Sequence, residues 1–411
     1  MRGARLLLGA LILSIVPAVA GAGGFELAQQ GAVAGGTAHA STARRDEASS
    51  AWFNPAALVD GAGLRLQLGL SVAFARIRSV SLAEAAGEPW DEVSITAPST
   101  PPYAYASWAG KRWAAGLSFN VPFGGGIRWA EDWAQRYDSI ESKPRFFRLA
   151  PFFAYRFGPV ALSAGPHVDM GGTLIDKATN HVSEDGRVRI ALRGVGVGGH
   201  ASVFVSIGER FAAGATYKSR VVMNLKGEAD FEVPAAFSPD FPDQPVSTRL
   251  VLPDRIALGF SYTAPRFLLV ADVGLTLWSV NKQLLIDFVY EGTKDSLSRA
   301  EWRDSVVVRV GGEVRVHELV MLRAGVYVDG IPGAPAPPEN LSPSSPDSTR
   351  IGVTVGAGFR PLEQLAVDLY VEQITLLRRA STSEDLPQAS YGGWALTGGV
   401  AATLLLGPAS P

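Results

Sequence analysis

Apolar and polar side chains alternate with a period of two along most of the chain after residue 61. In residues 306–316, Val308 and Val310 fall on one face and Arg309 falls on the other. Residues 64–74 and 366–372 repeat the pattern, with Leu or Val on one side and more polar residues on the other. This alternation predicts β-strands with one apolar and one polar face.

The alternation predicts fourteen strands, most of them ten or more residues long. They are expected at residues 63–80, 101–110, 112–121, 145–157, 159–176, 187–207, 210–222, 249–264, 266–280, 300–316, 318–329, 349–360, 363–377 and 391–406. Strands of this length suit a tilted crossing of a hydrocarbon layer, and an even number is usual in bacterial outer-membrane barrels.

The predicted connections alternate between short turns and long loops. Gly158-Pro159 and Gly208-Glu209 are typical of the short turns. The longer loops are predicted at residues 122–145, 223–248, 281–300, 330–348 and 378–390. Outer-membrane barrels have short turns at one end and long loops at the other. We therefore predict an all-β fold, a fourteen-stranded antiparallel transmembrane β-barrel over residues 61–411.

The first 22 residues have the features of a secretory signal peptide. Arg2 and Arg5 precede an apolar run at residues 6–16, and A-x-A sequences follow it. Later in the chain, no stretch contains eighteen consecutive apolar residues, as a membrane-spanning helix would. With the strand pattern, this predicts export to the bacterial outer membrane.

Composition and motifs argue against an enzyme. The net charge of −2 disfavours nucleic acid as a partner, and the absence of cysteine excludes thiol chemistry. The five histidines lack metal-ligand spacing, and no G-x-S-x-G motif occurs. The glycine-rich run at residues 194–199 lies in mid-strand, where small residues would let an inner segment approach the wall. We expect no catalytic residues, no cofactor and no metal.

Several segments resemble one family of membrane proteins, the FadL/TodX outer-membrane transporters of long-chain fatty acids and other hydrophobic compounds. The matching segments are residues 23–58 with the sequence SSAWFNPAAL at their end, VPFGGGIRWAEDWAQRYDS at 121–139, LPDRIALGFSY at 252–262, DVGLTLWS at 272–279 and LRAGVYVDGIPG at 322–333. They occur in order over nearly the whole chain that follows the predicted signal peptide.

The resemblance implies that residues 23–60 form an N-terminal hatch inside the barrel lumen. The turn of this hatch would be formed by Trp52, Phe53, Asn54, Pro55 and Ala56. The residues support the same placement independently of the resemblance. The large apolar side chains of Trp52 and Phe53 need burial, and a fourteen-stranded barrel is wide enough to need filling.

The predicted capture site lies in the loop at residues 122–145, which resembles the third loop of the family and is called the third loop below. Trp129, Trp133 and Tyr137 are spaced to share one face of a short helix, which Phe123 and Ile127 would extend. The resemblance implies a groove for a hydrophobic ligand here. The alternative is that these aromatic residues only pack the loop against its neighbours.

Deeper contacts are expected in the lumen. The resemblance places Phe25 and Leu27 at an inner pocket, and the inward-facing Arg309 and Arg323 could hold a carboxylate headgroup. The alternative for these arginines is a solvated lumen wall.

The predicted function is passive transport of hydrophobic molecules, long-chain fatty acids or hydrocarbons, by ligand-gated diffusion. The resemblance implies lateral exit into the bilayer, with a kink at Gly116 as a candidate position. Expected partners are the ligand, membrane lipid and the outer-membrane barrel-assembly machinery, and we expect a monomer. The alternative is a diffusion porin for small hydrophilic solutes, which would have an open lumen.

Overall fold

The computed structural model describes residues 24–45, 47–82, 89–181, 184–290, 293, 295–383 and 388–407. The predicted signal peptide lies outside these residues. None of the helices in the described part of the chain has the length and apolar character needed to cross a bilayer.

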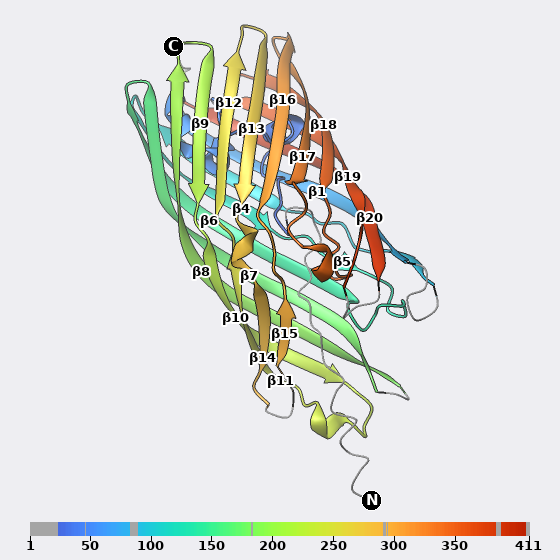
Figure 1. The fold of residues 1–411 in the computed structure, drawn as a ribbon. Coiled ribbons are helices and arrows are strands. Elements are labelled where there is room, and N and C mark those ends of the chain that lie inside the picture. Colours follow the sequence, from blue (N-terminus) through green and yellow to red (C-terminus); the bar gives the residue numbers. More distant parts are fainter. Residues whose placement is uncertain are drawn as a thin grey trace, which may run out of the picture.

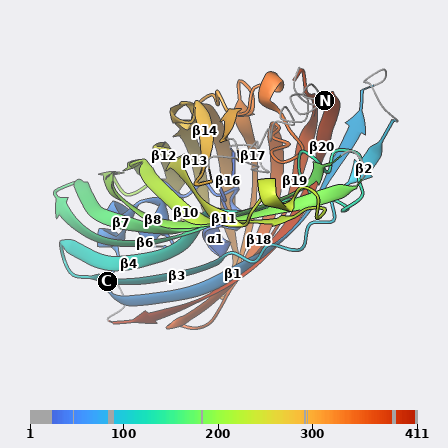
Figure 2. The same ribbon diagram turned by 90° about the horizontal axis from the view of Figure 1, so that it is seen from below.

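The described residues form one antiparallel sheet with short helical segments at the N-terminus and in the loops (Figures 1 and 2). The helices are α1 (Ala32–Gly36) and α2 (Ser50–Phe53), and the 3₁₀ segments are η2 (Pro55–Asp60), η3 (Ser238–Asp240), η4 (Trp278–Val280) and η5 (Pro338–Asn340). The strands are β1 (Gly63–Ser81), β2 (Asp91–Val93), β3 (Pro102–Ala109), β4 (Trp113–Phe123), β5 (Ile127–Arg128), β6 (Glu141–Phe157), β7 (Val160–Asn180), β8 (Asp185–Ile207), β9 (Phe211–Lys218), β10 (Val221–Glu232), β11 (Gln244–Leu252), β12 (Arg255–Thr263), β13 (Phe267–Thr276), β14 (Gln283–Phe288), β15 (Ser296–Arg299), β16 (Ser305–His317), β17 (Val320–Ile331), β18 (Arg350–Leu362), β19 (Leu365–Ala380) and β20 (Ala389–Leu406).

The sheet closes into the predicted barrel, because β20 pairs with β1 along its full length. Four passes across the wall are each built from two strands with a short interruption: β9 with β10, β11 with β12, β13 with β14, and β15 with β16. Counted as passes, the wall has fourteen strands, which confirms the prediction.

Two predicted loops are wrong. Residues 223–248 contain most of β10 and the first half of β11, and residues 281–300 contain β14 and β15. In this part of the barrel the faces are reversed. Met223 and Leu225 are buried on the inside, and Asn224 and Lys226 are exposed on the outside. These strands therefore extend beyond the lipid layer, where the outer face meets water.

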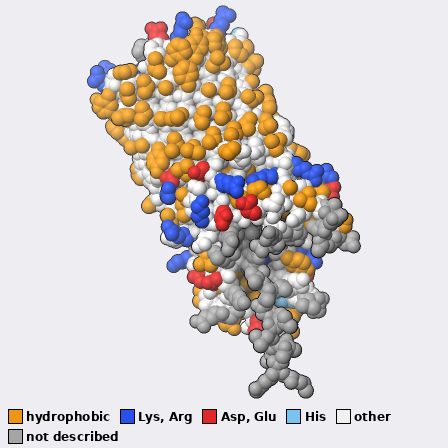
Figure 3. All heavy atoms as spheres, in the orientation of Figure 1, with side chains coloured by type: hydrophobic (Ala, Val, Ile, Leu, Met, Phe, Trp, Pro, Cys, Tyr) orange, Lys and Arg blue, Asp and Glu red, His pale blue; other side chains and the backbone are white. Residues whose placement is uncertain are grey.

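The outer surface of the other half carries the apolar band of a membrane protein (Figure 3). Val310 is 51% exposed on β16, Leu258 is 57% exposed on β12, and Val197 is 72% exposed on β8. Val308 and Val310 face outward, as expected from their place opposite the inward-facing Arg309, whereas their neighbour Val307 points inward and packs against Ala38. The short turns lie beyond this band, as expected for the periplasmic end.

The N-terminal segment lies inside the barrel, where it contacts several sides of the wall. Its closest approaches are made over wall glycines. A Cβ at Gly311 of β16 would stand 2.5 Å from the Thr37 carbonyl oxygen, and one at Gly325 of β17 would stand 2.7 Å from the Ala38 nitrogen. The glycine run at 194–199 does not serve this purpose, since Gly194 and Gly196 face neighbouring wall residues instead.

Candidate functional site

Two buried carboxylates of the wall hold the N-terminal segment. Glu372 of β19 accepts hydrogen bonds from Gln29 (3.0 Å) and Tyr327 (2.8 Å), and its other contact is His39 Nε2 at 3.2 Å. Asp272 of β13 accepts the backbone N–H groups of residues 41 and 42 at 2.8 and 2.9 Å. These strands lie apart on the wall, so the segment is fixed from more than one side.

The predicted turn residues span the junction of two short helical segments: Trp52 and Phe53 end α2, Asn54 joins the segments, and Pro55 and Ala56 begin η2. The Asn54 amide donates to the carbonyl oxygens of Thr42 (2.7 Å) and Val203 (2.9 Å), and its oxygen accepts the Ala56 N–H at 3.2 Å. Pro55 opens η2, where a missing N–H costs nothing. Asn54 therefore ties the turn both to its own segment and to strand β8.

Trp52 is buried beneath three cations. The Lys218 ammonium lies 4.5 Å from the ring centroid, and the guanidinium carbons of Arg255 and Arg148 lie at 5.2 and 5.7 Å. Arg148 is paired with Asp169 at 2.6 Å. Phe53, the next residue, is half-buried against the hydrophobic cluster that contains Trp52.

Phe25 fills an aromatic cage. Its ring centroid lies 5.1 Å from that of Trp278, 5.4 Å from Phe123, 6.0 Å from Phe146 and 6.3 Å from Trp302. Only 1% of Phe25 is exposed. The predicted inner residue therefore occupies the apolar pocket itself and leaves no space in it for a ligand.

The next two residues attach the segment to the wall. Glu26 forms an ion pair with Arg255 and accepts a hydrogen bond from Thr276 at 2.9 Å. The Leu27 N–H donates to the carbonyl oxygen of residue 122 at 2.9 Å, and the N–H of residue 124 donates to the Phe25 carbonyl oxygen at 2.8 Å. Residues 25–27 thus extend the sheet at the end of β4.

A cavity of about 180 Å³ lies beside this segment. Its walls are largely apolar and include Leu27, Ile77, Ile127, Ile374 and Leu376. Part of the outer boundary is the stretch 96–101, which lies outside the regular strand pairing. It joins β1 through the isolated bridge Ala73–Ser99 and through the Ser71 N–H, which donates to the Pro101 carbonyl oxygen at 3.2 Å. The cavity therefore reaches the wall where the sheet between β1 and β4 is incomplete.

The third loop is not helical, so the predicted short helix is wrong. Residues 131–138 form turns. The rings of Trp129 and Trp133 do stack, with centroids 4.4 Å apart, but both are buried, and Tyr137 lies apart from them with its hydroxyl donating to Asp185. The Trp129 indole donates to the carbonyl oxygen of Pro343 at 2.9 Å. The tryptophan pair packs behind Ile127 and the other isoleucines of the cavity wall.

The two predicted headgroup arginines differ in their surroundings. Arg323 is buried between Glu313 (2.5 Å) and Asp368 (2.7 Å), so its charge is already balanced. Arg44 of the N-terminal segment also pairs with Glu313 at 2.7 Å. Arg309 faces the lumen and forms no ion pair with any residue that the structure describes.

The irregularity in the third pass is not at Gly116. That residue is paired regularly with both β3 and β6. The register shift between β4 and β6 instead falls between Asn120 and Phe123, next to the contact with residues 25–27.

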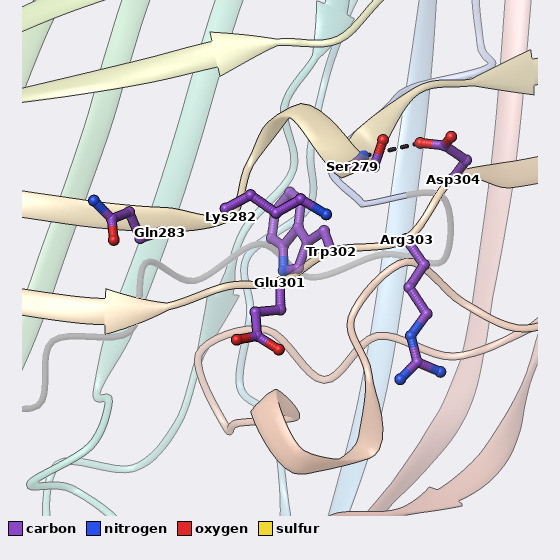
Figure 4. Close-up of a pocket in the computed structure, with 7 residues that line it drawn as sticks. All are labelled: Ser279, Lys282, Gln283, Glu301, Trp302, Arg303 and Asp304. Atoms are coloured by element: carbon purple, nitrogen blue, oxygen red, sulfur yellow. Dashed lines mark hydrogen bonds between the residues drawn. The ribbon is translucent and has the colours of Figure 1, made fainter.

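A second hollow, of about 570 Å³, opens on the outer side of the wall over the interruption between β13 and β14 (Figure 4). Its rim is polar, with Lys282, Glu301 and Arg303 exposed and the Ser279 N–H donating to Asp304 at 2.9 Å. Trp302 forms its inner side and belongs to the cage around Phe25.

Sequence reasoning missed the wall side of the cage. Phe146, Trp278 and Trp302 point into the lumen, whereas the alternation predicts a polar inner face for a membrane barrel. A usable signal was DVGLTLWS at 272–279, where the alternation stops at a tryptophan. Glu26 carried no local signal, since its partner Arg255 is more than two hundred residues away.

The sequence matches the family model described as outer membrane protein transport protein (OMPP1/FadL/TodX) over residues 13–405. No curated protein matches the sequence. Among solved structures, a Pseudomonas aeruginosa FadL homologue is 18% identical with a TM-score of 0.78, covering 92% of this chain and 99% of its own. The toluene transporters TbuX of Ralstonia pickettii (16% identity, TM-score 0.71, 91% and 97% coverage) and TodX of P. putida (17% identity, TM-score 0.71, 92% and 99% coverage) have the same fold. The chain therefore belongs to the OMPP1/FadL/TodX family of outer-membrane transport proteins.

Proposed function

We propose that the protein carries hydrophobic small molecules, long-chain fatty acids or hydrocarbons, across the outer membrane by ligand-gated diffusion. The observation that carries this proposal is the aromatic cage, because an apolar pocket in the lumen of a membrane barrel is filled by a side chain of the N-terminal segment. Family membership and the named substrates of the structural neighbours support the same class of ligand.

Residues 23–60 act as the hatch in this proposal. A ligand collects in the cavity beside Leu27 and then takes the place of the Phe25 ring. Burial of apolar surface drives both steps, at roughly 0.8 kcal/mol per CH₂ group. Arg309 remains the candidate for holding a carboxylate headgroup, whereas Arg323 belongs to the attachment of the hatch.

The exit is lateral in this proposal, at the end of β4. Residues 25–27 are hydrogen-bonded there, the register shifts there, and the neighbouring stretch 96–101 joins β1 through an isolated bridge and one further backbone hydrogen bond instead of a regular ladder. Displacement of Phe25 would therefore remove backbone hydrogen bonds from an already incomplete part of the wall. The ligand would leave into the bilayer without crossing water.

A porin for hydrophilic solutes needs an open lumen. In this proposal the hatch closes one end of the lumen. The loop at residues 332–349 supports closure of the other end, since Leu341, Ser342 and Ser348 are fully buried. The loop is held by hydrogen bonds from Trp129 and Arg379 to its carbonyl oxygens.

Two measurements on the same preparation test the proposal. Fluorescence titration in lipid nanodiscs should show saturable binding of a long-chain acyl probe, and planar bilayers should show negligible steady ion conductance. A variant that lacks residues 24–60 should conduct while retaining the heat-modifiable gel mobility of a folded barrel. Steady conductance by the intact protein without acyl binding would favour the porin and refute the transporter.

A further inference from the structure

The apolar positions of β8 change sides in mid-strand. Ile190 and Leu192 point inward, whereas Val195 and Val197 point outward, and the pairing with β7 is regular throughout. The outer surface therefore changes from polar to apolar at Arg193. This change marks the edge of the lipid layer on this side of the barrel.

Basic residues follow that edge across the neighbouring strands. Lys226 of β10 lies directly opposite Arg193, Arg249 of β11 lies opposite Asn224, and Lys282 precedes β14. All four basic side chains are exposed on the outside. Figure 3 shows charged side chains, basic and acidic, gathered below the apolar band.

A groove of about 690 Å³ runs between three of these residues. Lys226, Arg249 and Lys282 line it, and its apolar floor includes Val251 and Leu285. Neutral hydrogen-bonding groups lie among the cations, notably Asn224, Ser247 and Gln283. It is therefore a built surface with charge, hydrogen-bonding groups and an apolar base.

The charge of the groove is unbalanced. Arg220 at its margin is paired with Asp254 at 2.7 Å, but Arg193, Lys226, Arg249 and Lys282 form no ion pair with any described residue. Asp287 is the single carboxylate in the lining. Like charges directly opposite each other in a ladder, as at Arg193 and Lys226, destabilise a sheet unless an anion lies between them.

We propose that this groove binds the phosphorylated headgroup of an outer-leaflet lipid. Phosphate suits the groove because several lysine and arginine donors converge without carboxylate partners. The position of the groove at the edge of the apolar band suits a lipid. The acyl chains would lie along the apolar wall beside Val195 and Val197, which are 63% and 72% exposed. The hydroxyl and amide groups match a headgroup that carries sugar hydroxyls beside its phosphates.

The test uses the full-length mature protein in nanodiscs and two probes, a phosphorylated disaccharide lipid and the same lipid without its phosphates. We expect the phosphorylated lipid to bind at least tenfold more tightly in native mass spectrometry. The variant Lys226→Gln/Arg249→Gln/Lys282→Gln should lose this preference. A control variant at the periplasmic rim, Arg266→Gln/Arg315→Gln, should keep it.

A single reversal separates lipid binding from structural support. Lys226→Glu creates an opposite-charge pair with Arg193, so we expect thermal stability to be maintained or raised while binding of the phosphorylated lipid falls tenfold or more. Equal binding of the two lipids, retention of the preference in the triple variant, or displacement of the lipid by millimolar inorganic phosphate would each overturn the proposal. None of these outcomes depends on transport activity.

Discussion

Replacing Phe25 with alanine should strengthen ligand binding. If Phe25 were only a contact residue, its loss would weaken binding, as the sequence alone suggests. In the structure, however, its ring occupies the cage formed by Phe123, Phe146, Trp278 and Trp302. A ligand that enters this cage must first displace the ring, so removal of the ring removes a competitor.

The size of the effect follows from the burial. A Phe→Ala change at a buried position costs about 3–5 kcal/mol of stability. Here the conformation that is destabilised is the closed one, in which residue 25 lies in the cage. Since about 1.4 kcal/mol corresponds to a factor of ten, and since the Glu26 ion pair is unchanged in the variant, an affinity gain of roughly a hundredfold or more is expected.

Phe146→Ala is the matched control, because it removes a ring from the same cage on the wall side. A ligand in the cage would lose that contact, and we expect affinity to fall by roughly tenfold. Fluorescence titration with a long-chain acyl probe in nanodiscs measures both variants, and heat-modifiable gel mobility confirms that each barrel is folded. If Phe25→Ala weakens binding as much as Phe146→Ala does, Phe25 is not a competitor and the gating argument fails.

Three further predictions concern the wall, the hatch and the outer loop. Val310→Arg should lower the free energy of unfolding in bilayers by about 2–4 kcal/mol, because the side chain faces lipid, and equilibrium unfolding should show little change for Val310→Leu. Glu26→Gln removes the charge partner of Arg255, so hydrogen exchange at residues 24–27 and at Phe123 and Gly124 should rise at least tenfold; no such rise would contradict the role of this ion pair. Burial raises the pKa of Asp347 from 3.8 to about 7, so the folded loop is most stable with this carboxyl protonated and loses stability as the pH rises from about 4 to about 7. Limited proteolysis of residues 332–349 should therefore be faster at pH 8 than at pH 5, and Asp347→Asn should remove most of the difference.

The sequence predicted the wall well where lipid constrains it. Positions such as Val308 and Val310 had to be apolar because they face hydrocarbon, so the pattern identified both the strand and its outer face. The same constraint does not predict Val307, which is also apolar but packs inward against Ala38 of the N-terminal segment. Periodicity alone does not distinguish an apolar side chain that faces lipid from one that packs against the N-terminal segment.

The strands that project beyond the lipid layer were missed for a related reason. Met223 and Leu225 alternate with Asn224 and Lys226, but here the apolar side is the inside. Along β8 the change is visible in the sequence, since apolar residues occupy even positions up to Leu192 and odd positions from Val195. A change of phase without a bulge therefore indicates where a barrel leaves the membrane.

The candidate site was predicted only as far as local sequence could reach. Phe25, Phe123 and Ile127 were identified, and the structure places the first two in the cage and the third in the cavity wall. Their partners come from distant strands, and alternation carries no information about which inward residues meet across a lumen. The spacing of Trp129 and Trp133 predicted a shared helical face, but the two rings stack without a helix, and their burial depends on the loop that covers them.

Residues 25–27 join three structural elements that a ligand would have to change together. Phe25 fills the cage, Glu26 pairs with Arg255, and the backbone extends the sheet at the irregular end of β4. A ligand shifts such a conformational balance only by its difference in affinity between the two states. A molecule that fills the cage binds the displaced state alone, whereas one that fills only the cavity beside Leu27 fits both states. Opening should therefore depend on how completely a ligand replaces the Phe25 ring, and cavity binding without cage occupancy should leave the wall closed.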